Sequence, residues 1–299
     1  MSKRLLFGTD PEAFGAYMVG EKMYTLPPYY FRNMLGVTAS DDPKHPVFFK
    51  TDAYTFHEDG AAFEMAIHPS HNPKDLWDTI QECAKVAGEK ILSQFPDHCM
   101  PVLQFVPTIG FDVERWKNMG DDFRMSTRFG CDPDRDAFDF DKLSPEVDAS
   151  LWPHRHGGGH IHISGCSGFK DDPILAVQCQ ALTTGLAAIS YSDTPELDHE
   201  RTWMYGRPGK YRLQNYGKNN PFGPDYAVGI EYRTPSNRWA SDWNIAERVF
   251  HWAEIGVEIF ENGLGNTLLK DLTEPVTKAI LDADQKTAKE LLAFVESKL

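Results

Sequence analysis

Two short segments carry the residue types best suited to chemistry: residues 158–164 read GGHIHIS, and residues 229–239 read GIEYRTPSNRW. In each, polar side chains alternate with apolar ones as in a β-strand. The spacing therefore predicts that His160 and His162 share one sheet face and that Glu231 and Arg233 share another. A face with His-x-His or Glu-x-Arg is unsuited to packing, but it can hold a metal ion beside a phosphate or a carboxylate.

Three further carboxylates extend this candidate metal site. Asp10 and Glu12, in residues 8–14 (GTDPEAF), point the same way if the segment is extended, as a residue before proline tends to be. Glu64 is central in an otherwise apolar strand, where a carboxylate without partners is costly. Together with His160 and Glu231, these carboxylates suit magnesium or manganese better than zinc, and two ions could be bridged.

Each piece alone also has an ordinary structural explanation. A single Asp-Pro-Glu is usually a solvated turn, and His-x-His after the glycines at 157–159 can be a loop-to-strand junction. Glu231 and Arg233 can form an ion-pair ladder across strands. The joint occurrence of these pieces favours a site, in which the glycines let the backbone approach a ligand closely.

Cations cluster in the second half of the chain: Arg201, Arg207, Lys210, Arg212, Arg233 and Arg238. Because guanidinium groups bind phosphate and carboxylate through paired hydrogen bonds, the cluster favours a polyanion such as ATP or an acyl phosphate. We expect Arg201 and Lys210 to be surface residues instead. The sequence has neither the Gly-x-x-x-x-Gly-Lys-Ser/Thr loop nor a Gly-x-Gly-x-x-Gly motif after a strand. Bound ATP would therefore lie on a sheet, held by metals and arginines.

The elements that must position these residues are mixed. We predict strands at residues 5–7, 61–66 and 102–106, the last of them buried, and helices at residues 73–92, 174–191, 242–262 and 284–299. Asn72 followed by Pro73 is typical of a helix start, and Pro96 ends that helix. Residues 20–51 are rich in Pro, Tyr and Phe without a clear period, so they are predicted to cover the fold rather than form core elements. Residues 111–151 are acidic and irregular.

Composition limits the function classes. The 299 residues carry a net charge of −14, which argues against general affinity for nucleic acid or anionic membranes. Five scattered cysteines form no CxxC pair, so we expect reduced thiols in a cytoplasmic protein. No apolar run approaches membrane-spanning length, and no signal-peptide core follows the N-terminus. Without a linker or a shift in composition, the sequence predicts one domain over residues 1–299.

Taken in chain order, the motifs resemble the carboxylate-amine ligases of the glutamine synthetase-like fold, and within them the phage-type amidoligases called carboxylate-amine ligase type 2. The motifs are residues 8–14, 59–64 (DGAAFE), 130–134 (GCDPD), 159–164, 206–212 (GRPGKYR), 231–233 and 238–239. The resemblance spans most of the chain. It implies an α+β fold, with a curved antiparallel sheet forming an open half-barrel and helices packed on its outer face. It also implies the cytoplasm of a host cell as the location, if the protein is phage-encoded.

The resemblance also implies roles for single residues. ATP and two or three Mg²⁺ ions, or Mn²⁺ in their place, would lie in the half-barrel. The metal ligands would be Asp10, Glu12, Glu64, His160 and Glu231. His162 would face the nucleotide phosphates. Arg212 and Arg233, with Arg207 or Arg238, would hold the transferring phosphoryl group and the substrate carboxylate. Asp10 stands where related ligases more often carry glutamate. The role of residues 130–134 and the base that deprotonates the amine are left open.

The implied reaction joins a carboxylate to an amine through an acyl phosphate, giving an amide or isopeptide bond. The substrates would be an amino acid, a peptide or a modified small molecule, and the oligomeric state stays open. Two other classes compete with this interpretation. A cupin-like iron oxygenase also uses His-x-His, but residues 164–168 (SGCSG) lack the glutamate such sites usually need. A non-catalytic interaction protein could retain the ligase fold.

Overall fold

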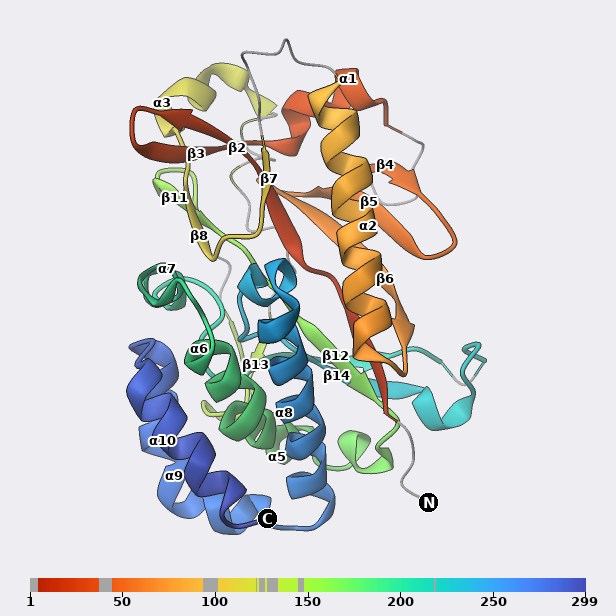
Figure 1. Cartoon of the computed structure of the whole chain (residues 1–299), viewed down its shortest axis with the longest axis vertical. Helices are drawn as coiled ribbons and strands as arrows, with labels where there is room; N and C mark the ends of the chain where they lie inside the picture. The colour runs from red at the N-terminus through yellow and green to blue at the C-terminus, as the bar shows by residue number, and fades with distance from the viewer. Residues whose placement is uncertain are drawn as a thin grey trace.

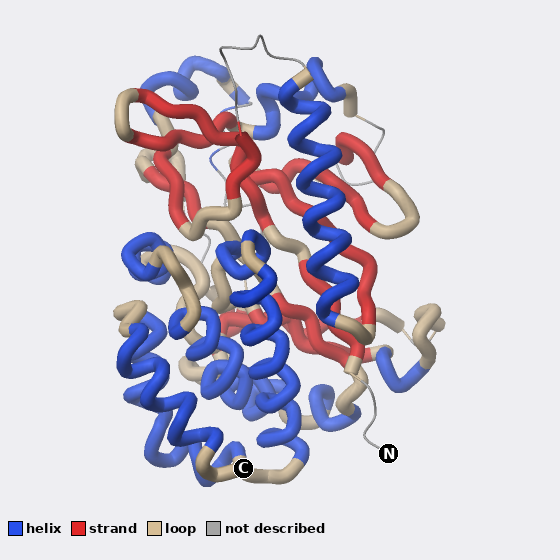
Figure 2. The backbone as a smooth tube through the Cα atoms, viewed as in Figure 1, coloured by secondary structure: helices blue, strands red, loops and turns tan. Residues whose placement is uncertain are grey.

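A computed structural model describes residues 5–37, 45–93, 102–121, 123, 127, 134–144, 148–217 and 219–299. Its strands join into one large open sheet that is mainly antiparallel, with helices packed against it (Figures 1 and 2). The strands are β1 (Leu6–Thr9), β2 (Glu12–Val19), β3 (Lys22–Leu26), β4 (Val47–Lys50), β5 (Tyr54–Asp59), β6 (Ala62–Ser70), β7 (Val102–Gln104), β8 (Thr108–Gly110), β9 (Arg135–Asp136), β10 (Lys142–Leu143), β11 (His154–His156), β12 (Ile161–Ser164), β13 (Lys210–Asn215) and β14 (Val228–Tyr232). The expected α+β class and open antiparallel sheet are confirmed.

The strand order brings distant segments together. Along the sheet the order is β10-β9-β13-β14-β12-β1-β6-β2-β3-β8-β11, while β5 also pairs with β6 and β4, and β7 pairs with β2. Among the described strands, β3 and β8 form the one parallel pair. The N-terminal strand β1 therefore lies in the middle of the sheet, antiparallel to both β12 and β6.

The helices gather mostly in the C-terminal half of the chain (Figure 1). They are α1 (Arg32–Leu35), α2 (Pro73–Leu92), α3 (Val113–Trp116), α5 (Pro173–Gln180), α6 (Leu186–Ser190), α7 (Pro195–Thr202), α8 (Trp243–Glu261), α9 (Gly265–Leu281) and α10 (Gln285–Glu296). A π-helical turn, Ala181–Gly185, joins α5 to α6 into one continuous helix.

Local capping signals explain why four predicted helices are confirmed. Each starts after a side chain that accepts a hydrogen bond from the first turn: Asn72, Asp172, Asp242 and Asp284. Pro96, the predicted end of the first helix, lies outside the described residues. Among the described helices of eight or more residues, α7 and α9 were not predicted, and neither were the four-residue helices α1 and α3. In α9 the amphipathic pattern contains Pro275, which reads as a helix breaker in the sequence but is accommodated within the helix.

Two predictions about residues before the glycine-rich loop were wrong in part. Strand β7 is shorter than predicted, and Val102 in it is exposed rather than buried. Residues 20–51 do contribute core elements, because β3 and β4 pair within the sheet and Phe31 and Phe48 are buried in the main hydrophobic cluster. The hydrophobic pattern of residues 20–51 has no clear period because each short element in the segment contributes only single aromatic side chains to the core.

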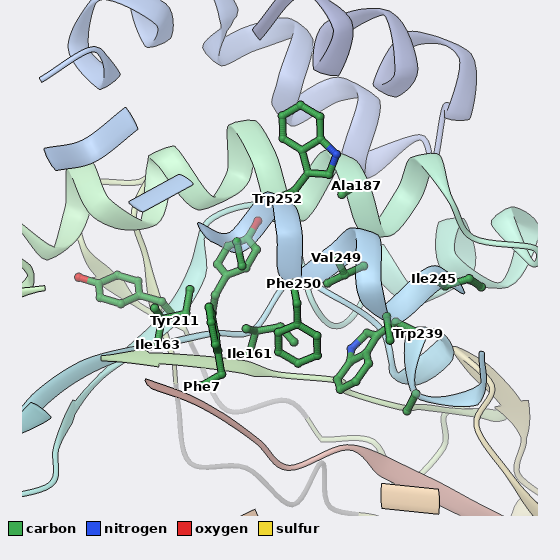
Figure 3. Packing of buried hydrophobic residues seen from close by; sticks show 14 of the residues in the cluster. Phe7, Ile161, Ile163, Ala187, Tyr211, Trp239, Ile245, Val249, Phe250 and Trp252 are labelled. Atoms are coloured by element: carbon green, nitrogen blue, oxygen red, sulfur yellow. The ribbon is translucent and has the colours of Figure 1, made fainter. Parts of the chain in front are cut away.

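The core lies between one face of the sheet and the C-terminal helices. Strand residues Phe7, Ile161 and Ile163 point toward Val249 and Phe250 of α8, and all five are buried (Figure 3). Since strand side chains alternate between faces, their sequence neighbours must point away from these helices. Among the described residues, one helix, residues 173–190, is long and apolar enough to cross a membrane, so the expectation that no apolar run approaches that length was wrong. In the fold, 72% of that window is buried, as in a core helix.

Candidate metal centre

One row of paired residues, mostly polar, crosses four adjacent strands on the face opposite α8. In this row Gly8 of β1 pairs with His162 of β12, His162 with Glu231 of β14, and Glu231 with Arg212 of β13. The prediction that the histidine pair and the Glu231–Arg233 pair occupy different faces was therefore wrong. Alternation along a strand shows which of its residues share a face. Only the pairing register between strands shows that residues of different strands lie on the same face of the sheet.

The first candidate cation set contains Asp10, His160 and Glu231, which offer ligand atoms within 4.8 Å of one another. His160 Nδ1 lies 3.1 Å from Asp10 Oδ1 and 3.6 Å from Glu231 Oε1. His162 contacts the same aspartate, with Nε2 3.2 Å from Asp10 Oδ2. His160 and Glu231 are almost fully buried, so this polar set is enclosed in the protein.

The second candidate set contains Glu12, Asp59 and Glu64, whose carboxylate oxygens satisfy the same 4.8 Å limit. Glu12 and Glu64 are paired directly across β2 and β6. Glu64 is also paired with His57 across β6 and β5, with Nε2 and Oε1 2.9 Å apart. Asp59, at the end of β5, belongs to the motif at residues 59–64 but was not predicted as a ligand.

Electrostatics distinguishes the two sets. Burial, with further contributions from neighbouring carboxylates, raises the pKa of Glu12 and of Glu64, and it raises the pKa of Asp59 from 3.8 to about 8. Burial would also raise the pKa of Glu231, but the charges of Arg233 and His162 outweigh it and lower that pKa to about 2. Three buried carboxyl groups that repel one another fit a divalent cation, which would replace their lost hydration.

The glycine-rich loop fastens to the second set. The Gly158 N–H donates to Glu12 Oε2 at 2.8 Å, and a Cβ at this glycine would lie 2.4 Å from His160 Nε2. Trp239 Nε1 donates to the Gly159 carbonyl at 2.9 Å, and Asn237 Nδ2 donates to the Glu12 carbonyl at 2.8 Å. The glycines were expected to let the backbone approach a bound ligand. In the structure the glycine backbone closely approaches the chain's own candidate metal-binding residues.

Two of the predicted arginines face the first set. Arg233 is buried and its Nη1 donates to Glu231 Oε1, while Arg212 Nη1 lies 3.8 Å from the same oxygen. Arg233 Nε also lies 3.6 Å from Asp134 Oδ2. Asp134 is the last residue of the 130–134 motif, and the rest of that motif lies outside the described residues.

The other predicted cations lie elsewhere. The side chain of Arg238 pairs with Asp193 and donates to the Phe105 carbonyl at 3.3 Å. Arg207 is exposed and lines a cavity of about 380 Å³ beside Lys210. The expectation that Arg201 and Lys210 are surface residues was wrong, since Arg201 is 1% exposed and the Lys210 side chain 14%.

Sequence reasoning also missed residues that hold the sets in place. Gln214 Nε2 donates to Glu231 Oε2, and Tyr216 Oη lies 3.2 Å from His162 Nδ1. Tyr205 Oη lies 2.9 Å from His160 Nε2. Gln214 could have been found from its position two residues after Arg212, on the same strand face. Tyr205 and Tyr216 lie outside the strands and carry no periodic signal.

The chain was also compared with known proteins. Neither a scan against protein-family models nor a search of curated proteins found a match.

Proposed function

We propose that the protein is an ATP- and Mg²⁺-dependent carboxylate-amine ligase that forms an amide or isopeptide bond through an acyl phosphate. The observation that carries the proposal is the pair of adjacent candidate cation sets, Asp10/His160/Glu231 and Glu12/Asp59/Glu64, with Arg233 against the first. Carboxylates and imidazole at this spacing fit hard divalent cations, and a neighbouring guanidinium fits a phosphoryl group. The motif resemblance points to the same chemistry.

The fold is compatible with the glutamine synthetase-like arrangement, which we include in the proposal. An open antiparallel sheet carries the candidate ligands on one face, and α8 covers the opposite face around Phe250 (Figure 3). The candidate ligands therefore lie on the side of the sheet away from α8. The domain would be single, spanning residues 1–299.

In the proposed reaction, the substrate carboxylate attacks the γ-phosphorus of ATP, giving an acyl phosphate and ADP. An amine then attacks the acyl carbon, phosphate leaves, and the amide remains after loss of one proton. The two sets would hold divalent cations, whose positive charge would offset repulsion between the carboxylate and the triphosphate. Arg233 and Arg212 orient and neutralise the transferring phosphoryl group, and His162 lies beside Asp10 to face the phosphates.

The electrostatics of His162 supports this role. Burial alone would lower the pKa of its imidazole, but the charge of Asp10 and a hydrogen bond to it raise the pKa to about 9. A protonated His162 would add a positive charge at the edge of the first set. Arg238 pairs with Asp193 and Arg207 lines a separate cavity, so Arg212 and Arg233, which contact Glu231, are the stronger candidates for phosphoryl contacts.

The proposal is tested by ADP release in the presence of Mg²⁺, ATP and a panel of carboxylates, with hydroxylamine as a general amine that traps the acyl phosphate as a hydroxamate. His160→Ala and Glu231→Ala should abolish the hydroxamate, while Glu290→Ala, on the exposed face of α10, should not change it. Full ATP turnover in both site variants would show that the assigned site is wrong. Iron binding without ATP binding would favour the oxygenase class instead.

A further inference from the structure

A tyrosine hydroxyl lies between the two candidate cation sets. Tyr205 follows α7, and its Oη is 2.9 Å from His160 Nε2, 2.9 Å from Arg233 Nη2 and 3.4 Å from Glu12 Oε1. His160 belongs to the first set and Glu12 to the second. One hydroxyl therefore contacts a candidate ligand of each set, together with the arginine beside them.

The donor and acceptor types of these partners fit one set of hydrogen-bond directions. Arg233 can only donate, so the Tyr205 oxygen accepts from it. Tyr205 donates its single proton to Glu12 Oε1. In this set Arg233 Nη1, 3.3 Å from His160 Nδ1, donates to that nitrogen, and His160 Nε2 carries the ring proton and donates it to the Tyr205 oxygen. His160 Nδ1 is then unprotonated, and it is this nitrogen that faces Asp10 and Glu231.

This tautomer is the one that a metal site on the first set requires. A ligating imidazole binds through one nitrogen, and its other N–H usually donates to a fixed partner that orients the ring. Nε2 is also the nitrogen that faces the glycine-rich loop, because a Cβ at Gly158 would lie 2.4 Å from it. His160 can thus bind a metal ion through Nδ1, on the side of Asp10 and Glu231, while Nε2 is held by Tyr205 beside the glycine-rich loop.

The tyrosine is itself held firmly. The guanidinium of Arg201 lies over its ring at 4.8 Å, and the His160 ring meets it edge-on with centroids 6.1 Å apart. The Tyr205 N–H donates to the Arg201 carbonyl at 2.8 Å. Arg201 is anchored in turn, since Nη1 donates to the Thr234 carbonyl at 2.7 Å and Nη2 to the Pro235 carbonyl at 3.1 Å. This explains why Arg201 is buried.

We propose that Tyr205 is a positioning residue that sets the His160 tautomer and couples the two cation sets. The inference rests on the proposed metal centre, not on a particular substrate. Removing the hydroxyl frees a ligand of each set to reorient. Loss of such a partner to a ligating histidine typically weakens metal affinity about 10- to 100-fold.

The test is Mn²⁺ binding to the full chain by titration calorimetry, with Tyr205→Phe compared with Tyr211→Phe. The control removes another tyrosine hydroxyl that donates to a carboxylate, Asp141 Oδ1 at 2.6 Å, but Tyr211 points into the core on the other sheet face. Tyr205→Phe should bind Mn²⁺ at least 10-fold more weakly, whereas Tyr211→Phe should bind within two-fold of the wild type. Wild-type affinity in Tyr205→Phe would overturn the inference.

A second measurement does not depend on a variant. Nitrogen-15 NMR of histidine-labelled wild-type protein with Mg²⁺ should show the His160 ring protonated at Nε2. Protonation at Nδ1 alone would overturn the inference even if Tyr205→Phe failed to fold. The outcome for the proposed function is separate: a wild-type protein that binds neither Mn²⁺ nor Mg²⁺ would refute the metal centre itself, and the positioning role with it.

Discussion

Asp59→Asn should change how the stability of the metal-free protein depends on pH. Asp59 is buried at the end of β5, and burial together with the charge of Glu64 raises its pKa from 3.8 to about 8. Between these values the folded chain keeps the Asp59 proton, while the unfolded chain has released it. The folded state then binds more protons, so its stability falls as pH rises.

The magnitude follows from this difference in pKa. Each pH unit between about 4 and about 8 costs about 1.4 kcal/mol for this single group. From pH 5 to pH 7 the wild type should therefore lose about 2.7 kcal/mol that Asp59→Asn does not lose. Asparagine has nearly the shape of the protonated aspartate, so the comparison isolates the titration.

The assay is urea unfolding at pH 5, 6 and 7 in the presence of EDTA. Asp193→Asn is the control, because the hydrogen bond from Arg238 lowers the pKa of Asp193, which stays ionised in both states over this range. Its unfolding free energy should run parallel to that of the wild type. Parallel curves for the wild type and Asp59→Asn would refute the reasoning. Adding Mg²⁺ at pH 7 should stabilise the wild type more than Asp59→Asn, since the cation favours the ionised carboxylate.

Three further predictions concern the surroundings of the site. Gly158→Ala should weaken Mn²⁺ binding and cost about 1–3 kcal/mol of folding free energy, because its Cβ would lie 2.4 Å from His160 Nε2. The control is Gly88→Ala, in the interior of α2 with open space around it. In urea unfolding this variant should be more stable than the wild type by about 1 kcal/mol. Burial lowers the pKa of His156 to about 3, so the folded protein excludes a proton that the unfolded chain binds below about pH 6.5, and stability should fall as pH drops. His156→Gln should lose less stability than the wild type between pH 7 and pH 5; equal losses would contradict this. Arg238→Ala should keep hydroxamate formation within a few-fold of the wild type. It should lower the free energy of unfolding by no more than about 1 kcal/mol, since the ion pair of Arg238 with Asp193 is partly exposed. Complete loss of activity would instead support the substrate contact that the resemblance implies for Arg238.

Local signals in the sequence were enough for the helices that begin with a cap. Asn72 and Asp242 each accept a hydrogen bond from a backbone N–H two residues later, which involves only neighbouring residues. Helix α9 was not predicted; it has no side-chain cap at its start and contains Pro275, so no local signal marks it. At such positions tertiary packing outweighs the intrinsic helix propensity of the residues.

The candidate site was predictable in its residue types but not in its arrangement. Alternation along one strand shows that His160 and His162 share a face, whereas the pairing of His162 with Glu231 depends on register between strands. Tyr205 follows a helix that the sequence analysis missed, and its contact with His160 results from the packing of that helix against the sheet. No spacing rule relates these two residues.

The central position of β1 governs when the site can form during biosynthesis. Asp10, Glu12 and Glu64 leave the ribosome long before Glu231, yet β1 pairs with β12, and β12 pairs with β14. Until the last of these strands emerges, the early carboxylates lack Arg233 and Glu231, one of the three residues of the first cation set. Pairings between such distant segments also form slowly. Metal capture is therefore expected to follow synthesis of most of the chain, and an N-terminal fragment that ends before β14 should bind no ion at the first set.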